Sequence, residues 1–460
     1  MSNLPCFLKY LLKITKICDR LISPFKKIQG DNMKLAKLSL AAIVVAGLAS
    51  SSFAADTLAD AFKNGKVNGE LRAWYWDRDT TVADADIFNT GLILGYVTDS
   101  FYGFTLGATL QSNYAPTADK DAKALFAGDE YGSGAVLSEA YVAYNMKNTT
   151  VKVGRQFINT PLVSGSGSRM IKQSFEGALV LNTDLPQTTL AAGYVSRYQA
   201  RTNGLGDAPE FSKTADFQGP GALYFDGAYT ALVINKSIAN LALVAQYATV
   251  NDVNHAADVD VYHVEANYVL PMSGFKLGFD AAYRASSTEG ALSGAGIEGN
   301  YLAGRIGVSE LAGFGASFAY GQSDSSDDLV AGMGGGADNL YTNTIIRGGG
   351  EAYQANTDAY LFNATYDFTQ IGAPGFKAIG QYAVYNQDKL NVASFKRAIN
   401  QEIDYTKYVG ALSYDFSGAL KGLSVTAVYE TQEKETKNTV AGTTTSVDTD
   451  EVRFMANYKF

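Results

Sequence analysis

Segments of about ten residues that alternate apolar with polar or small side chains recur along most of the chain. In the last segment Val452, Phe454 and Tyr458 share one face of the pattern, and Arg453 and Asn457 share the other. Successive side chains of a β-strand point to opposite faces, so this period predicts strands with one apolar and one polar face. The same alternation is found in the segments 275–284, 301–309, 360–368 and 423–430.

Short and long connections separate these segments. The short connections include 147–149, 184–187, 271–274 and 417–419, and the long ones include 114–135, 199–221, 323–353 and 432–448. We count about eighteen strands between Lys66 and Phe460, in the range of barrels that are wide enough for an aqueous channel. Backbone groups in lipid must all be paired, which a closed barrel achieves. The pattern therefore predicts an all-β fold, a transmembrane antiparallel β-barrel of about 18 strands.

The amino terminus contains a predicted export signal. A basic start at Met33–Lys37 precedes an apolar run over 38–48 and a small-x-Ala end at Ser52–Ala54. We expect cleavage after Ala54, so that 33–54 is the signal peptide and 55–460 the barrel. Residues 1–32 precede a complete signal and are interpreted as a start assigned too early; an extended signal is the alternative.

Removing this leader changes the charge and the cysteine count. Residues 1–54 hold eight basic and two acidic residues, so the net charge of −9 becomes −15 without them. This acidity argues against nucleic-acid binding. Both cysteines, Cys6 and Cys18, lie in the leader, which leaves neither a disulfide nor a thiol nucleophile. His255 and His263 match no catalytic or metal-binding spacing, so we expect no enzyme, cofactor or metal site.

One segment carries a family resemblance. Residues 151–181 contain Gly154-Arg155-Gln156, Thr160-Pro161, Ser168-Arg169 and Phe175-Glu176-Gly177, and this order resembles the OprD family of porins. The composition also resembles the major porins of epsilon-proteobacteria. The resemblance implies an 18-stranded barrel in which the loop at about 158–173 folds inward to narrow the pore. The Gly-Ser run at 164–168 stands where the family pattern has an acidic residue.

Two groups of candidate site residues follow. We expect the pore constriction to be formed by residues of the inward-folded loop and of the segment that precedes it. These residues are Arg155, Ser164, Ser166, Ser168, Arg169 and Lys172. The alternation of side chains along each predicted strand places a second group of residues on the face that lines the pore. They are Glu70, Arg72, Arg197, Glu265, Asp280, Arg284, Arg305, Lys407, Glu430 and Arg453. Mixed charges of this kind create a field across a pore that favours dipolar, hydrated solutes.

These features predict a porin of the bacterial outer membrane. We expect passive diffusion of small hydrophilic solutes and ions through a water-filled pore that an inward-folded loop narrows. The expected partners are outer-membrane lipid and lipopolysaccharide, the barrel-insertion machinery through Phe460, and two further copies in a homotrimer, with no nucleic acid. The alternative is a barrel-scaffold adhesin or calcium-binding surface protein, because 324–328 forms an acidic loop.

Overall fold

A computed structural model describes residues 55–218, 220–338 and 340–460. The predicted signal peptide and the residues before it lie outside these ranges. No helix within the described ranges has the length and apolar character that crossing a lipid bilayer requires.

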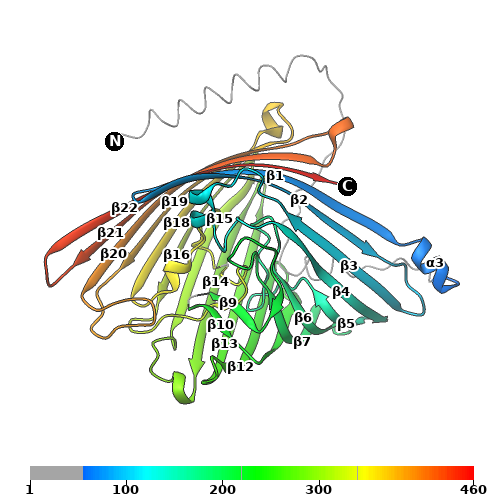
Figure 1. The fold of residues 1–460 in the computed structure, drawn as a ribbon, viewed down its shortest axis with the longest axis horizontal. Coiled ribbons are helices and arrows are strands. Elements are labelled where there is room, and N and C mark those ends of the chain that lie inside the picture. Colours follow the sequence, from blue (N-terminus) through cyan, green and yellow to red (C-terminus); the bar gives the residue numbers. More distant parts are fainter. Residues whose placement is uncertain (1–54, 219, 339) are drawn as a thin grey trace. The chain divides into compact units, whose positions relative to one another are not determined.

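Within the described residues, eighteen antiparallel strands form one closed wall (Figure 1), which confirms the predicted fold class. The first nine are β1 (Lys66–Thr80), β2 (Ala83–Val97), β3 (Phe104–Asn113), β4 (Gly134–Met146), β5 (Thr149–Gln156), β6 (Ser174–Asn182), β7 (Thr188–Gln199), β11 (Gly227–Asn235) and β12 (Leu241–Val253). The other nine are β13 (Ala257–Met272), β14 (Phe275–Thr288), β15 (Asn300–Leu311), β16 (Phe314–Ser323), β18 (Thr357–Asp367), β19 (Phe376–Gln387), β20 (Gln401–Asp415), β21 (Leu423–Asn438) and β22 (Thr443–Lys459).

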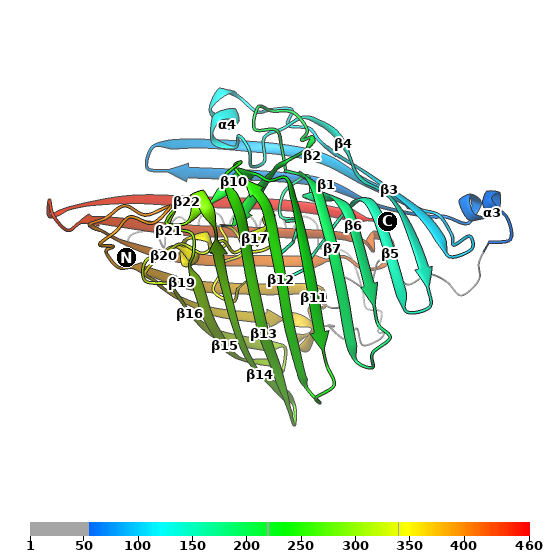
Figure 2. The same cartoon turned by 90° about the horizontal axis from the view of Figure 1, so that it is seen from below.

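Each wall strand pairs with its neighbours in the sequence, and β1 closes the wall against β22. In this closing pair Arg72 lies opposite Asn457 and Trp76 lies opposite Arg453. Figure 2 shows the first and last strands side by side, with β11 to β14 on another side of the wall. The backbone ladder is therefore continuous around the barrel, as a strand structure in lipid requires.

The connections differ between the two ends of the barrel. At the end where β1 begins and β22 ends, which we call the turn end, the described strands are joined by short segments such as 147–148 and 273–274. The opposite loop end carries the long connections 114–133, 157–173, 200–226 and 324–356. The predicted long loop at 432–448 is wrong, because its polar residues continue β21 and β22 to a tight turn at 439–442.

Short elements lie outside the wall, mostly in the long connections. They are the helices α3 (Leu58–Lys63) and α4 (Lys120–Leu125), the strands β8 (Phe211–Ser212), β9 (Thr214–Gln218), β10 (Gly221–Tyr224) and β17 (Gly332–Met333), and the 3-10 helices η1 (Gly290–Leu292), η2 (Gly350–Tyr353), η3 (Phe368–Ile371) and η4 (Gly418–Leu420). β17 pairs with β9, which pairs with β10, so the 200–226 and 324–356 connections share one small sheet.

The outer face of the wall is an apolar band between two sets of aromatic residues. Exposed side chains such as Val153, Phe279, Ile306, Phe318 and Phe454 form the band. Toward the loop end, aromatic pairs lie across neighbouring strands, as in Tyr194–Tyr229, Tyr247–Tyr262, Tyr320–Tyr360 and Tyr382–Tyr408. Toward the turn end, the pairs include Phe104–Tyr144, Phe376–Tyr414 and Tyr458–Phe460. Such aromatic girdles mark the two membrane interfaces of a lipid-spanning barrel.

The long connections pack inside the barrel against the inner face of the wall. In one cluster Leu162 of the 157–173 connection, Phe217 of the 200–226 connection and Met333 of the 324–356 connection are buried with the strand residues Val195 and Val250. Three connections therefore pack together against the inner face of β7 and β12, and the alternation of strand side chains did not predict this packing.

Candidate functional site: the barrel interior

The 157–173 connection crosses the interior and is held at both sides of the barrel. On one side Arg72 Nη1 of β1 donates to the carbonyl oxygen of Met170 over 3.2 Å, and Gln111 Nε2 of β3 donates to that of Lys172 over 2.9 Å. On the other side the backbone N–H of Leu162 donates to Gln246 Oε1 of β12 over 2.9 Å. We call this segment the crossing loop.

The crossing loop buries three of the six residues that were predicted for the constriction, Ser164, Ser166 and Arg169. Ser164 donates to Asn159 Oδ1 over 2.7 Å, and the backbone N–H of Ser166 donates to Gln173 Oε1 over 2.9 Å, so both serines are buried within the loop. Ser168 is exposed, and the side chain of Lys172 retains 34% exposure while lying 3.7 Å from Glu70. Within the predicted set, Ser168 and Lys172 are therefore the residues that can meet a passing solute.

Arg169 lies in the crossing loop but is 9% exposed and fully paired. It forms an ion pair with Asp129 of the neighbouring 114–133 connection, and its guanidinium lies over the Trp76 ring at 4.8 Å. Arg78 reaches the other oxygen of Asp129 at 2.9 Å. Burial alone would raise the pKa of Asp129, but Arg169 and Arg78 hold it well below its usual range. The positive charge of Arg169 is thus neutralised by Asp129.

Glu130 is buried beside this pair without a cation of its own. Its Oε2 accepts from the backbone N–H of Met170 over 3.4 Å, and its Oε1 has no hydrogen-bond partner among the described residues. Burial raises the pKa of Glu130 to about 8, against the opposing effect of Arg169. The carboxyl group is therefore mostly protonated at neutral pH. Sequence reasoning missed Asp129 and Glu130, whose only signal was an acidic pair within a long loop.

Most residues predicted to line the pore lie on the inner face of the wall. These are Glu70, Arg72, Glu265, Asp280, Arg284, Arg305, Lys407, Glu430 and Arg453. Several of them hold the 324–356 connection: Arg284 Nη1 donates to the carbonyl oxygen of Ala331 over 2.7 Å, and Tyr341 donates to Glu265 Oε1 over 2.8 Å.

These inner-face charges are largely paired with one another or with the loops. Arg305 lies 2.8 Å from Asp280, and Lys407 lies 3.3 Å from Glu351. Arg453 lies 2.6 Å from Glu451, and Arg347 of the 324–356 connection lies 3.1 Å from the same carboxylate. Buried charges need such partners because an unpaired one is costly to remove from water. The sequence placed these residues on one face but did not indicate their pairing.

Arg155 and Arg197 are placed differently from the prediction, on the outer face of the wall. Arg155 is still within β5 and shares its face with Val153, because the crossing loop begins after Gln156. Arg197 follows an irregularity in the β6–β7 pairing, where Glu176 lies opposite Arg197 and Gly177 opposite Val195. The extra residue reverses the alternation that had predicted an inward Arg197.

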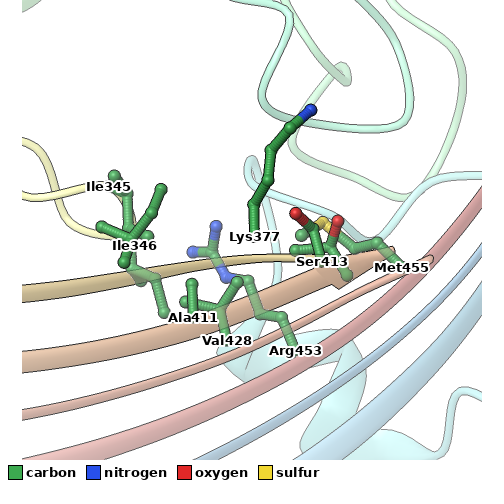
Figure 3. Close-up of a pocket in the computed structure, with 10 residues that line it drawn as sticks. Ile345, Ile346, Lys377, Ala411, Ser413, Val428, Arg453 and Met455 are labelled. Atoms are coloured by element: carbon green, nitrogen blue, oxygen red, sulfur yellow. The ribbon is translucent and has the colours of Figure 1, made fainter. Parts of the chain in front are cut away.

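A recess of about 300 Å³ opens on the inner wall of β19 to β22 (Figure 3). Its lining combines the cations Lys377 and Arg453 with apolar side chains such as Ile346, Val428 and Met455. In the close-up, Arg453 extends toward Ile345 and Ile346 of the 324–356 connection, and Lys377 points away from the strands. Arg453 Nη2 has no hydrogen-bond partner among the described residues. The recess can therefore receive a small anion with an apolar body.

The comparisons with known proteins agree with this architecture. The family model described as outer membrane porin, OprD family, matches residues 60–460. Among curated proteins no match is found. The solved structures that resemble the chain include Pseudomonas aeruginosa OccK2 (OpdF) in complex with glucuronate, with a TM-score of 0.71 and 15% identity over 87% of this chain and 98% of that one. P. aeruginosa OpdK with vanillate has a TM-score of 0.70 and 15% identity over 87% and 99% of the two chains. P. aeruginosa OccK8 (OprE) has a TM-score of 0.69 and 16% identity over the same shares.

Proposed function

The chain belongs to the OprD family of outer-membrane porins, and from this premise we propose that its crossing loop forms the narrow part of the diffusion path. It is a porin of the bacterial outer membrane, a family of barrels through which solutes diffuse. The observation that carries the proposal is the crossing loop itself, which is anchored on β1 and β3 at one side and on β12 at the other.

Solutes that pass the crossing loop meet few uncompensated charges. Lys172 is partly exposed on the loop, and Arg305 is partly exposed on the inner wall above Tyr341. Both cations have a carboxylate nearby, Glu70 and Asp280 respectively. This arrangement supports diffusion of small hydrophilic solutes and ions, because paired charges orient hydrated dipoles without binding them tightly.

The recess on β19 to β22 supports small carboxylates as one class of solute. An arginine presents a planar fork of donors that matches a carboxylate, and the apolar lining suits a compact carbon skeleton. Two of the similar barrels were solved with carboxylate compounds, OpdK with vanillate and OccK2 with glucuronate. We propose that Arg453, whose Nη2 has no hydrogen-bond partner among the described residues, holds the carboxylate, and that Val428 and Met455 contact the rest of the molecule.

Further parts of the proposal concern processing and assembly. Cleavage after Ala54 would release a barrel of 55–460, with residues 1–32 absent from the mature protein. Phe460 would be recognised by the barrel-insertion machinery, lipopolysaccharide would surround the loop end, and three barrels would associate. The porin family is not a family of enzymes, and we propose no catalysis. The family match does not favour the adhesin alternative.

Reversal potentials in a salt gradient test the diffusion path. Lys172→Glu should shift the permeability ratio toward cations by at least about twofold, because a charge beside a narrow path changes the local ion concentration. Lys437→Glu is the matched control, since Lys437 lies near the loop-end tip of β21, where it is exposed and paired with Glu402 at 2.7 Å. A shift that is as large at Lys437 as at Lys172 would contradict the proposed path.

A further inference from the structure

The outer face of the wall carries a row of charged residues on β5, β6 and β7. Glu176 of β6 lies opposite Arg155 of β5 and opposite Arg197 of β7. Arg155 Nε donates to Glu176 Oε2 over 3.1 Å, and Arg197 Nε lies 4.0 Å from Glu176 Oε1. The row therefore has two guanidinium groups around one carboxylate, with a net charge of +1.

This row lies at the loop-end edge of the apolar band. Val153, Ala178 and Tyr194 form the adjacent row of the same face, one step closer to the band. Tyr194 belongs to the loop-end girdle through its ring contact with Tyr229, at a centroid distance of 4.9 Å. Girdle aromatics lie at the level of the lipid headgroups, so the guanidinium groups lie at or just above that level.

The two arginines differ in how firmly they are held. Arg155 lies over the ring of Phe211 at 4.4 Å and donates to the carbonyl oxygen of Leu137 over 3.4 Å, so its position is fixed. Arg197 keeps 52% of its side chain exposed, and Glu176 is its charged neighbour within the described residues. One cation is thus positioned and the other is free to close on a ligand.

Other charged positions of the outer face beyond the girdle are mainly acidic. They include Asp77, Asp79, Asp84, Asp86, Asp258, Asp260, Asp358, Asp404, Glu433, Glu435, Asp448 and Asp450. Lys437 is a cation among them, and Glu402 pairs with it at 2.7 Å. A negatively charged headgroup would be repelled along most of this surface and attracted at β5 to β7.

We propose that Arg155 and Arg197 bind a phosphate group of the outer-leaflet lipid, the phosphorylated glucosamine headgroup of lipid A. Guanidinium groups bind phosphate oxygens through two parallel hydrogen bonds, which favours arginine over lysine at such a site. The apolar rows below, with Val153, Val180 and Tyr194, contact the acyl chains of the same lipid. The inference rests on the proposed function in one respect, the placement of the loop end at the side of the membrane that carries lipopolysaccharide, and it is independent of the diffusion path.

Lipid binding to the full-length mature protein, measured by native mass spectrometry in detergent, tests this site. The probes are bisphosphorylated lipid A, its dephosphorylated form and inorganic phosphate. The Arg155→Gln/Arg197→Gln variant should bind bisphosphorylated lipid A at least about tenfold more weakly than the unmodified protein, because the loss of even one charged hydrogen-bonded contact has about this effect. Lys437→Gln, which removes a paired cation elsewhere on the outer face, should leave this affinity unchanged.

Several outcomes would overturn the proposal. These are equal affinity of the double variant and the unmodified protein, equal affinity for the phosphate-free lipid, and inorganic phosphate that binds as tightly as lipid A. Loss of an oligomer without loss of lipid binding would instead assign the row to contact with a second copy. If the double variant does not fold, judged by heat-dependent migration in gels, Arg155→Lys/Arg197→Lys replaces it. That variant keeps the charge and loses the planar fork, so its affinity should fall by about threefold.

Discussion

At the scale of single residues, the electrostatic field inside the barrel depends on which charged side chains have no partner of opposite charge. Arg169 and Arg78 share Asp129, and Arg453 and Arg347 share Glu451, so four inward cations contribute little free charge. Lys172 keeps a third of its side chain exposed on the crossing loop. Counting inward charges from the sequence therefore overestimates the electrostatic field that a solute meets.

Glu130 makes the docking of the 114–133 connection depend on pH. Its pKa of about 8 in the folded protein lies above the ordinary value of 4.5. Its contribution to docking is therefore complete below about pH 4.5 and is lost as the pH rises through about 8. Arg169, Asp129 and Arg453 are the charged groups that influence it. We expect trypsin to cleave at Lys120 and Lys123 faster at pH 9.5 than at pH 6.5.

The Glu130→Gln variant is the control for this experiment, because its amide remains neutral at both pH values. The ratio of the cleavage rates at pH 9.5 and pH 6.5 should be several-fold smaller in the variant than in the unmodified protein, which also corrects for the pH dependence of trypsin. Equal ratios in the two proteins would show that Glu130 does not control the docking of this loop.

At the scale of elements, the alternation of side chains predicts a strand's faces only while its pairing is regular. Arg284 and Glu430 lie on the inner face because β14 and β21 pair without interruption around them. Arg197 does not, because one extra residue in β7 reverses its side. A bulge of this kind depends on tertiary contacts and leaves no clear pattern in a single sequence. The packing of three loops into one core could not be predicted from the alternation of side chains along the strands either.

The contact between the crossing loop and the 324–356 connection depends on Gly334. Its φ is +88°, and a Cβ at this position would lie 2.2 Å from the carbonyl oxygen of Ser164. Gly334→Ala should therefore separate the two loops and raise single-channel conductance and noise while the barrel still assembles. Gly350→Ala in the same connection is the control, since a Cβ there meets no atom within 4 Å. Equal conductance of the two variants would argue against a coupled pair of loops.

The two faces of one strand should respond differently to the same substitution. Phe318 of β16 is on the outer face within the apolar band, whereas the adjacent Ser317 faces the interior opposite Asn363. Phe318→Arg should cost about 2–4 kcal/mol and reduce the assembled fraction, because it places a charge in lipid. Ser317→Arg should assemble nearly normally, measured by heat-dependent migration of outer-membrane preparations. Similar losses for both variants would contradict the assigned faces.

At the scale of the whole molecule, the barrel was predictable and its interior was not. Many amphipathic segments in series and the family motif around Gly154-Arg155-Gln156 indicate a closed wall, since each segment supports the same fold. The path that a solute takes through the barrel depends on the positions of the 114–133, 157–173 and 324–356 connections. Their positions depend on long-range contacts such as Arg169 with Asp129, whose members lie in different loops.

Single-channel recording of the purified mature protein in a planar bilayer tests the central claim most directly. A water-filled barrel that a crossing loop narrows should give discrete, repeated current steps that rise in proportion to salt concentration. Protein whose folding has been verified by heat-dependent migration, yet which gives no current steps across a range of voltages and salt concentrations, would contradict the account of this chain as an open diffusion porin.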